Sequence, residues 1–225
     1  MEYLLSLLSD DVNPFVFGFF TIGALLLLYI ASYYLRTKTK TNRLFGSGLA
    51  LTGAAFLFWA FVTGFQPTNL IVYTTVGALL FLTALIAFFV SYVSSLKSKR
   101  VRTVYWVVGA VTLLAFLAMR FLFFQSDPGF SEEGFFSFNI NQLVVYGYVV
   151  LLACSIAPAT FAVATKMKNQ LLAGVTRFGF SLITIGTAIL LTSPDNYMQT
   201  INGVGMLIGF FVLALVHSFT PIESK

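Results

Sequence analysis

Hydrophobic residues occur in seven long runs separated by short polar segments, and this pattern dominates the chain. The runs cover approximately residues 14–35, 45–63, 70–92, 103–124, 142–165, 171–193 and 199–218. A helix needs about 20 residues to cross about 30 Å of hydrocarbon, so each run is long enough for one span. Because backbone groups in lipid must be satisfied internally, runs this continuous form helices and not barrel strands. We therefore predict an all-α polytopic membrane protein with seven transmembrane helices in a single membrane domain, residues 1–225.

The composition agrees with this prediction and limits where an activity can lie. Hydrophobic residues make up 58% of the chain and charged residues only 9%, which is typical of a multi-span membrane protein. The longest connection, residues 125–141, is rich in phenylalanine, and we expect its Phe130, Phe135, Phe136 and Phe138 to lie on the membrane surface. No connection is long enough for a soluble catalytic, nucleotide-binding or nucleic-acid-binding domain. Any activity must therefore lie within the helix bundle or at one of its two ends.

Charged residues divide between the two sides of the predicted bundle. The positive-inside rule places connections rich in Lys and Arg in the cytoplasm. We therefore predict an integral protein of the cell membrane with an external N-terminus, a cytoplasmic C-terminus and an uncleaved first span. The basic residues that follow the first, third and fifth spans are Arg36, Lys38, Lys40, Arg43, Lys97, Lys99, Arg100, Arg102, Lys166 and Lys168. The acids of the opposite side are Glu2, Asp10, Asp11, Asp127, Glu132, Glu133 and Asp195.

The first and last three spans share a pattern of residues when the chain is displaced on itself by 128 positions. This register suggests parallel three-helix repeats, residues 14–92 and 142–218, joined by a linker helix at 103–124. Parallel repeats place a binding site at the repeat interface in several transporters. Alternatively, any two three-helix units of the same topology share basic loops. The most informative pairs are Lys38 with Lys166, Lys40 with Lys168, Gly46 with Gly174, and Gly77 with Gly205.

Short sequence patches within this 3+1+3 layout resemble the SWEET sugar facilitators of the PQ-loop superfamily. Asn202 and Gly205 are similar to the Asn-x-x-Gly motif that begins the seventh helix of that family. Trp59 corresponds to a tryptophan late in the second helix, and Pro158 to a proline in the fifth. Thr74 replaces an asparagine of the third helix, and the chain has no Pro-Gln pair. The resemblance implies a small carrier that moves sugars without an energy source.

Four polar residues fall at similar depth in the outer third of their spans: Trp59, Thr74, Thr187 and Asn202. Polar side chains are costly in hydrocarbon, so each is a candidate functional residue. Together they offer a stacking face, two hydroxyls and an amide, which suits binding of a small polar solute. The structural alternative is that Thr and Asn hydrogen-bond between helices, and that Trp59 belongs to the outer aromatic belt.

Basic residues within the spans have two possible roles. Arg177 lies about two turns from the cytoplasmic end of the sixth span. Its guanidinium either reaches the inner headgroups or faces a cavity, where it would attract an anionic ligand. Arg120 is closer to the outer surface, and we expect it to reach the headgroups. The only histidine, His217, is expected at the inner membrane interface.

Glycine and proline residues indicate packing or motion. The second span has a face of small residues, formed by Gly46, Gly48 and Gly53. The seventh span has a similar face, formed by Gly205 and Gly209. Close helix packing is the ordinary role of such glycines. Pro158 removes a hydrogen bond in the middle of the fifth span. We therefore consider Pro158 and Gly205 as a hinge.

Several function classes lack the residues that they require. One histidine cannot supply a bis-histidine haem site, and Cys154, the only cysteine, cannot form a disulfide within the chain. The seventh span has no lysine for a retinal Schiff base, and no nucleophile motif is present. Because all acids lie outside the spans, transport coupled to buried carboxylates is not expected. We expect no enzyme activity, no cofactor, no metal site and no nucleic-acid partner.

Three hypotheses follow from these residues. The leading one is a facilitative carrier of a small neutral polar solute, in which two three-helix halves move around Trp59, Thr74, Thr187 and Asn202. The second is a non-catalytic membrane subunit or scaffold that docks with itself, partner subunits or lipids. The third is a seven-helix sensor without retinal. A carrier requires a hydrated cavity between the halves, whereas a scaffold predicts a dry bundle with a large interface.

Overall fold

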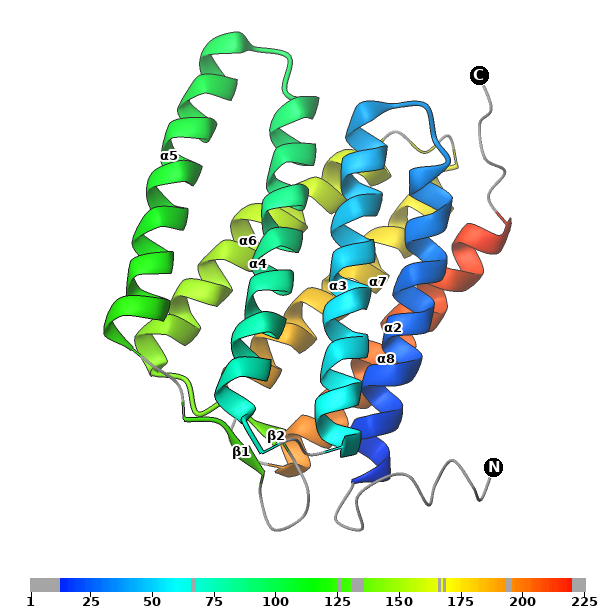
Figure 1. The fold of residues 1–225 in the computed structure, drawn as a ribbon. Helices are drawn as coiled ribbons and strands as arrows, with labels where there is room; N and C mark the ends of the chain where they lie inside the picture. The colour runs from blue at the N-terminus through cyan, green and yellow to red at the C-terminus, as the bar shows by residue number, and fades with distance from the viewer. Residues whose placement is uncertain are drawn as a thin grey trace.

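The computed structural model describes residues 13–65, 68–124, 127–130, 136–165, 167, 169–192 and 196–219. These residues form seven helices that are long and apolar enough to cross a membrane, which confirms the predicted all-α fold with seven long apolar helices. Figure 1 shows their arrangement. They are α2 (Pro14–Leu35), α3 (Lys40–Phe65), α4 (Leu70–Ser95), α5 (Lys99–Ala118), α6 (Gln142–Ala164), α7 (Gln170–Thr192) and α8 (Asn196–Phe219). A π-helical turn, η1 (Met119–Phe123), continues α5.

Several helices extend beyond the apolar runs that predict them. α3 begins at Lys40 and not at residue 45, and α4 continues to Ser95 and not to 92. Hydropathy marks only the part of a helix that lies in hydrocarbon, whereas its polar ends continue into the headgroup region. Polar caps set some of the starts, because the Asn13 side chain accepts from the Phe15 amide at 3.0 Å.

Six of the helices form a ring, and α5 stands outside it. α3 packs between α2 and α4, and α7 packs between α6 and α8. Contacts of α4 with α6 and of α2 with α8 close the ring. In Figure 1, α2, α3 and α4 form the front layer, α6, α7 and α8 lie behind, and α5 is at one side. This neighbour order is unchanged when the two three-helix halves are exchanged, as a parallel repeat would require, and the repeat itself stays a prediction.

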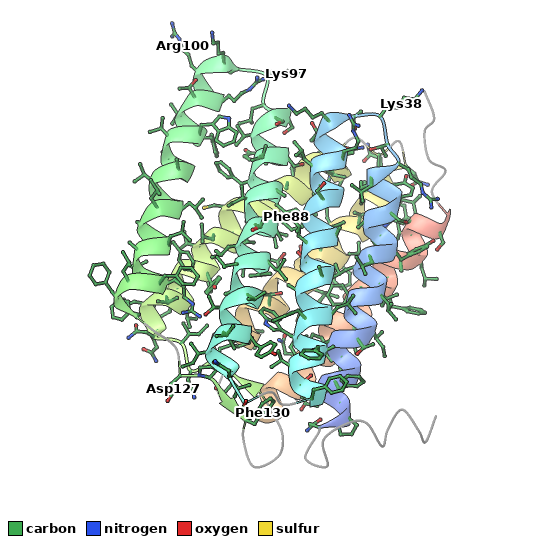
Figure 2. All side chains as sticks on the ribbon, in the orientation of Figure 1. Lys38, Phe88, Lys97, Arg100, Asp127 and Phe130 are labelled. Carbon is green, nitrogen blue, oxygen red and sulfur yellow. The ribbon has the colours of Figure 1, made fainter. Side chains whose placement is uncertain are left out.

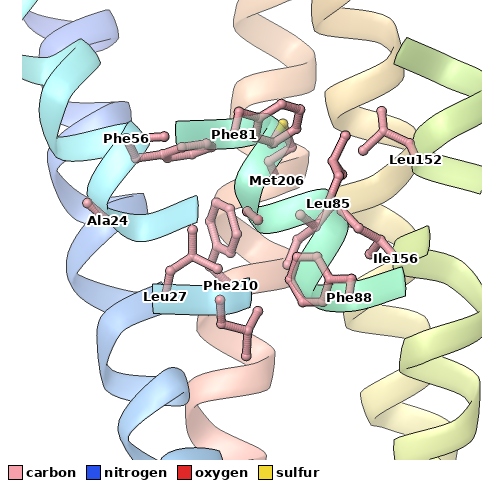
Figure 3. Close-up of a cluster of buried hydrophobic side chains, with 14 of the residues drawn as sticks. Ala24, Leu27, Phe56, Phe81, Leu85, Phe88, Leu152, Ile156, Met206 and Phe210 are labelled. Carbon is pink, nitrogen blue, oxygen red and sulfur yellow. The ribbon is translucent and has the colours of Figure 1, made fainter. Parts of the chain in front are cut away.

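Aromatic and aliphatic side chains together fill the ring interior. Phe45 and Phe88 meet at 5.2 Å between ring centroids, and Phe56 and Phe210 meet at 5.9 Å. All four rings are buried and come from α3, α4 and α8. Figure 3 shows three of them, Phe56, Phe88 and Phe210, packed with aliphatic neighbours such as Leu85. Aromatic pairs in edge-to-face geometry add stability beyond the apolar area that they bury.

Glycines allow the closest helix approaches. A Cβ atom on Gly46 would lie 2.9 Å from the Tyr34 Cβ, and one on Gly48 would lie 2.8 Å from the Phe88 ring. The predicted packing role of these α3 glycines is confirmed. On α8, a Cβ on Gly209 would lie 2.9 Å from the Gly179 carbonyl, whereas one on Gly205 would meet no atom within 4 Å. The packing prediction is therefore right for Gly209 and wrong for Gly205.

Apart from Arg120 and Arg177, the charged residues that the structure describes lie toward the two ends of the bundle. Figure 2 shows Lys38, Lys97 and Arg100 at one end, which we call the basic end, and Asp127 at the opposite end. This distribution is the one that the positive-inside argument uses. His217 lies near the basic end but is buried, with an exposed fraction of 3%. The prediction of an interfacial histidine is wrong because the Tyr34 hydroxyl, 2.7 Å from its Nε2 atom, supplies a partner inside the bundle.

The connection after η1 contains two short strands that the hydropathy pattern does not predict. β1 (Gly129–Phe130) and β2 (Phe136–Ser137) pair antiparallel. Asn139 then turns the chain with a φ of 42°, a conformation that asparagine tolerates. This turn directs Phe138 into the bundle, where its ring lies 5.1 Å from that of Trp59. The expectation that Phe138 lies on the membrane surface is therefore wrong, and Phe135 lies outside the described residues.

Candidate functional site

A small cavity of about 30 Å³ lies inside the ring, toward the end that carries Asp127. Its lining side chains come from α3, α4, η1, α6, α7, α8 and the connection before α6. The apolar part of the lining includes Phe56, Phe81 and Met206, which Figure 3 shows at a similar level of the core. The polar part consists of Trp59, Arg120, Tyr148 and Thr187. The cavity thus lies where the first three helices meet the last three.

Trp59 reaches the cavity from α3 because Gly77 of α4 leaves room for it. A Cβ atom on Gly77 would collide with the indole Nε1 of Trp59. The indole is only 7% exposed and packs edge-on against Phe20 and Phe138. This burial excludes a place in the outer aromatic belt. Within the described part of the chain, Nε1 has no hydrogen-bond partner, so a buried donor is available beside the cavity.

Thr187 of α7 lines the same cavity as Trp59. Its hydroxyl donates to the Ile183 carbonyl of its own helix at 2.8 Å. The oxygen can still accept a hydrogen bond from a ligand, because a hydroxyl carries two lone pairs. The structure therefore places two of the four predicted polar residues, Trp59 and Thr187, in the lining of one cavity.

Arg120 and Tyr148 also line the cavity, and the sequence reasoning missed both as site residues. Arg120 is only 4% exposed, so the expectation that it reaches the headgroups is wrong. It lies four residues after Phe116, the buried residue of α5, and therefore on the same face. The Tyr148 ring packs 4.7 Å from the Phe116 ring. The sequence shows that Arg120 is a charged residue within a predicted span. It does not show which side of the helix the side chain lies on.

Asn202 and Thr74 do not line the cavity. The Asn202 amide donates across the helix interface to the Gly186 carbonyl of α7, as the structural alternative expects. Asn202 lies one turn before Met206, which does line the cavity. Thr74 donates to the Leu70 carbonyl of its own helix at 2.9 Å.

Arg177 lies apart from the cavity. Its guanidinium carbon is 4.7 Å from the centroid of the Phe161 ring of α6, a cation–π contact. The candidate hinge residues are also separate from the cavity lining. α6 runs unbroken through Pro158, and Gly205 has open space beside it. Among the described residues, no group of three or more His, Cys, Asp or Glu side chains could hold a metal ion.

Comparison with known proteins gives this chain no relatives from which to transfer a function. No family model, curated protein or solved structure matches it. The similarity to the SWEET facilitators therefore stays a prediction from short sequence patches. The function has to be argued from the cavity and the surfaces of the bundle.

Proposed function

We propose that the protein is a facilitative carrier of a small, sugar-like polar solute, with the cavity as its binding site. The placement of polar side chains between the two halves supports this proposal. Trp59 comes from α3 of the first half, and Thr187 comes from α7 of the second. In transporters built from parallel repeats, movement of one half against the other exposes such a site to each side of the membrane in turn.

The polar lining favours a solute that is rich in oxygen atoms. Arg120 contributes a guanidinium with five N–H donors, and Trp59 contributes the free indole donor. A buried donor without a partner costs about 1–3 kcal/mol, and a bound oxygen atom would recover this energy. The rings of Phe56, Phe81 and Phe138 supply apolar faces for the C–H groups of a sugar.

We interpret the structure as a closed state of the proposed carrier because its cavity is small. A volume of about 30 Å³ holds a water molecule, whereas small-molecule sites have about 300 Å³ or more. Binding therefore requires the two halves to separate. The ring closes through the contacts of α4 with α6 and of α2 with α8, so these two interfaces are where it opens.

The acidic residues argue for transport without proton coupling. None of the seven described helices contains an Asp or Glu residue. A proton relay through the bundle normally uses buried carboxylates. The solute would therefore move down its own gradient.

Uptake by proteoliposomes tests the proposal. Purified protein in liposomes should equilibrate one or more radiolabelled monosaccharides or polyols faster than protein-free liposomes do. Trp59→Phe removes the indole donor but keeps an aromatic ring, and we expect it to raise the half-saturating concentration. A wild-type protein that moves none of these solutes would remove the carrier from consideration.

Two observations favour a second candidate, a non-catalytic subunit of a larger membrane complex. The ring interior is largely filled by aromatic and aliphatic side chains, and α5 exposes most of its surface. Val104, Val111 and Leu114 of α5 are 60–67% exposed. Chemical cross-linking in native membranes followed by purification tests this candidate. It predicts a stoichiometric membrane partner cross-linked to α5, whereas the carrier requires none.

A further inference from the structure

A cleft of about 450 Å³ separates α5 from α4 and α6. Its volume is within the range of small-molecule sites and is about fifteen times that of the cavity in the ring. Most of the lining is apolar, with Ile86 from α4, Leu113 from α5 and Val150 from α6. The cleft is therefore suited to a hydrocarbon chain and not to a polar solute.

Contacts between aromatic side chains join α5 to the bundle near the two ends of this helix. Toward the basic end, Trp106 and Tyr105 pack against Phe89 and Tyr92 of α4, with centroid distances of 5.8 and 5.5 Å. At the other end, Phe116 packs against Tyr148 of α6. Between these contacts the Phe89 ring of α4 reaches the α5 backbone at Gly109, and only a small part of α5 is buried. Two fixed ends keep the middle of the cleft open.

The cleft can be entered from the side of the bundle. Its lining residues Val108 and Val150 are 59% and 50% exposed, and Cys154 is exposed as well. In a membrane this side faces lipid. Hydrocarbon chains fill such a space more favourably than water does, because water would lose hydrogen bonds against apolar walls.

Basic residues occupy the turn between α4 and α5, beyond the end of the cleft that Tyr92 and Tyr105 line. Lys97, Lys99 and Arg100 are all exposed there, and Figure 2 shows Lys97 and Arg100 at this turn. Arg102 donates to the Leu96 carbonyl at 2.7 Å and so holds the turn together. Cations in the first turn of a helix interact unfavourably with the helix dipole, and a bound anion would offset this effect.

We propose that the cleft binds one anionic phospholipid of the surrounding membrane. An acyl chain lies between α5 and α6, and the phosphate lies against Lys97, Lys99 and Arg100. The apolar walls select a hydrocarbon chain, and the three cations select a negative headgroup over a zwitterionic one. In the predicted orientation the basic end is cytoplasmic, which is the leaflet where anionic lipids attract basic segments. This site is independent of the proposed carrier function.

Quenching of Trp106 fluorescence by brominated lipids tests the site. Trp106 lines the cleft, whereas Trp59, the second tryptophan, is buried in the ring. A Trp106→Phe protein gives the fluorescence of Trp59 alone, which serves as the baseline. In nanodiscs with a low fraction of brominated lipid, brominated phosphatidylglycerol should quench Trp106 with at least a fivefold preference over brominated phosphatidylcholine. A factor of about five corresponds to one basic residue acting on an anionic headgroup.

Two triple variants separate this site from general attraction by the basic end. K97A/K99A/R100A should abolish the preference, whereas R36A/K38A/K40A removes the same charge from exposed positions at the α2–α3 turn and should keep it. A further variant, Ala153→Phe, narrows the cleft and should reduce the preference without changing charge. Equal quenching by the two lipids, equal loss in the two triple variants, or an unchanged preference in Ala153→Phe would each overturn the proposal.

Discussion

The imidazole Nε2 of His217 lies 2.7 Å from the hydroxyl of Tyr34, and this contact joins α8 to α2 inside the bundle. The other ring nitrogen, Nδ1, lies 2.6 Å from the Leu213 carbonyl. A carbonyl oxygen only accepts, so Nδ1 carries the proton of the neutral ring and Nε2 accepts from Tyr34. Both side chains are buried, at 3% and 2% exposure. The contact therefore belongs to one of the two interfaces at which the halves of the ring meet.

Tyr34→Phe should destabilise the protein because it leaves the His217 Nε2 atom buried without a donor. The expected loss is about 1–3 kcal/mol, observed as a lower midpoint of thermal unfolding in detergent. Tyr73→Phe is the matched control, since the Tyr73 hydroxyl has no hydrogen bond within the described residues and should be dispensable. Equal midpoints for the two variants would show that the Tyr34–His217 bond adds no stability.

Gly77→Ala should displace Trp59, whereas Gly205→Ala should be tolerated. The two glycines occupy matching positions in the predicted repeat, but only at Gly77 would a Cβ atom collide with an indole. Overpacking of this kind costs about 1–3 kcal/mol. Alanine at Gly205 meets open space and improves helix propensity by up to about 1 kcal/mol. Thermal unfolding and tryptophan emission would measure both effects, and a tolerated Gly77→Ala with unshifted emission would contradict the described packing.

Asn202→Ala should lower stability more than it lowers solute affinity. The amide ties α8 to α7 through the Gly186 carbonyl and does not line the cavity. Cross-helix hydrogen bonds in membranes contribute about 0.6–2 kcal/mol. Thermal unfolding and the half-saturating concentration for uptake should be measured on the same preparations. A variant with normal stability but weaker solute binding would show that Asn202 contacts the solute, and would contradict this prediction.

Arg120→Gln should weaken solute binding about 10-fold or more, because hydrogen bonds to a charged group contribute about 1.5–3 kcal/mol. Arg177→Gln is the control, since Arg177 is also within a helix but packs on Phe161 outside the cavity. Titration of the solute against Trp59 fluorescence in a Trp106→Phe background would measure both affinities. Similar losses in the two variants would place the solute elsewhere.

The position of a residue along its helix could be predicted from the sequence, but the direction of its side chain around the helix could not. The spans and the shared level of Trp59 and Thr187 follow from positions along apolar runs. Arg120 lies within a predicted span, yet its side chain points inward because it shares the buried face of Phe116. His217 likewise lies at the predicted end but turns toward Tyr34. The rotation of each helix about its own axis depends on which helix packs beside it. Hydropathy that is uniform around a helix does not indicate this rotation.

Helix packing on α8 shows the same limit at the level of single residues. The spacing of Gly205 and Gly209 predicts that both lie on one closely packed face of α8. In the structure, Asn202, Met206, Gly209 and Leu213 form the row that meets α7. This 4-3-4 spacing leaves Gly205 at the edge of the contact. Only the position of α7 determines which of two glycines one turn apart is packed.

Solute binding between the two halves of the ring is the central claim, and Thr187→Val tests it most directly. The control is Thr184→Val on the same helix, because Thr184 makes the same hydrogen bond to its own helix at 2.8 Å but does not line the cavity. The measurement is the initial rate of labelled solute uptake into proteoliposomes. We predict that Thr187→Val slows uptake severalfold and that Thr184→Val matches the wild type. Equal rates in the two variants, or no uptake by the wild type, would contradict the account.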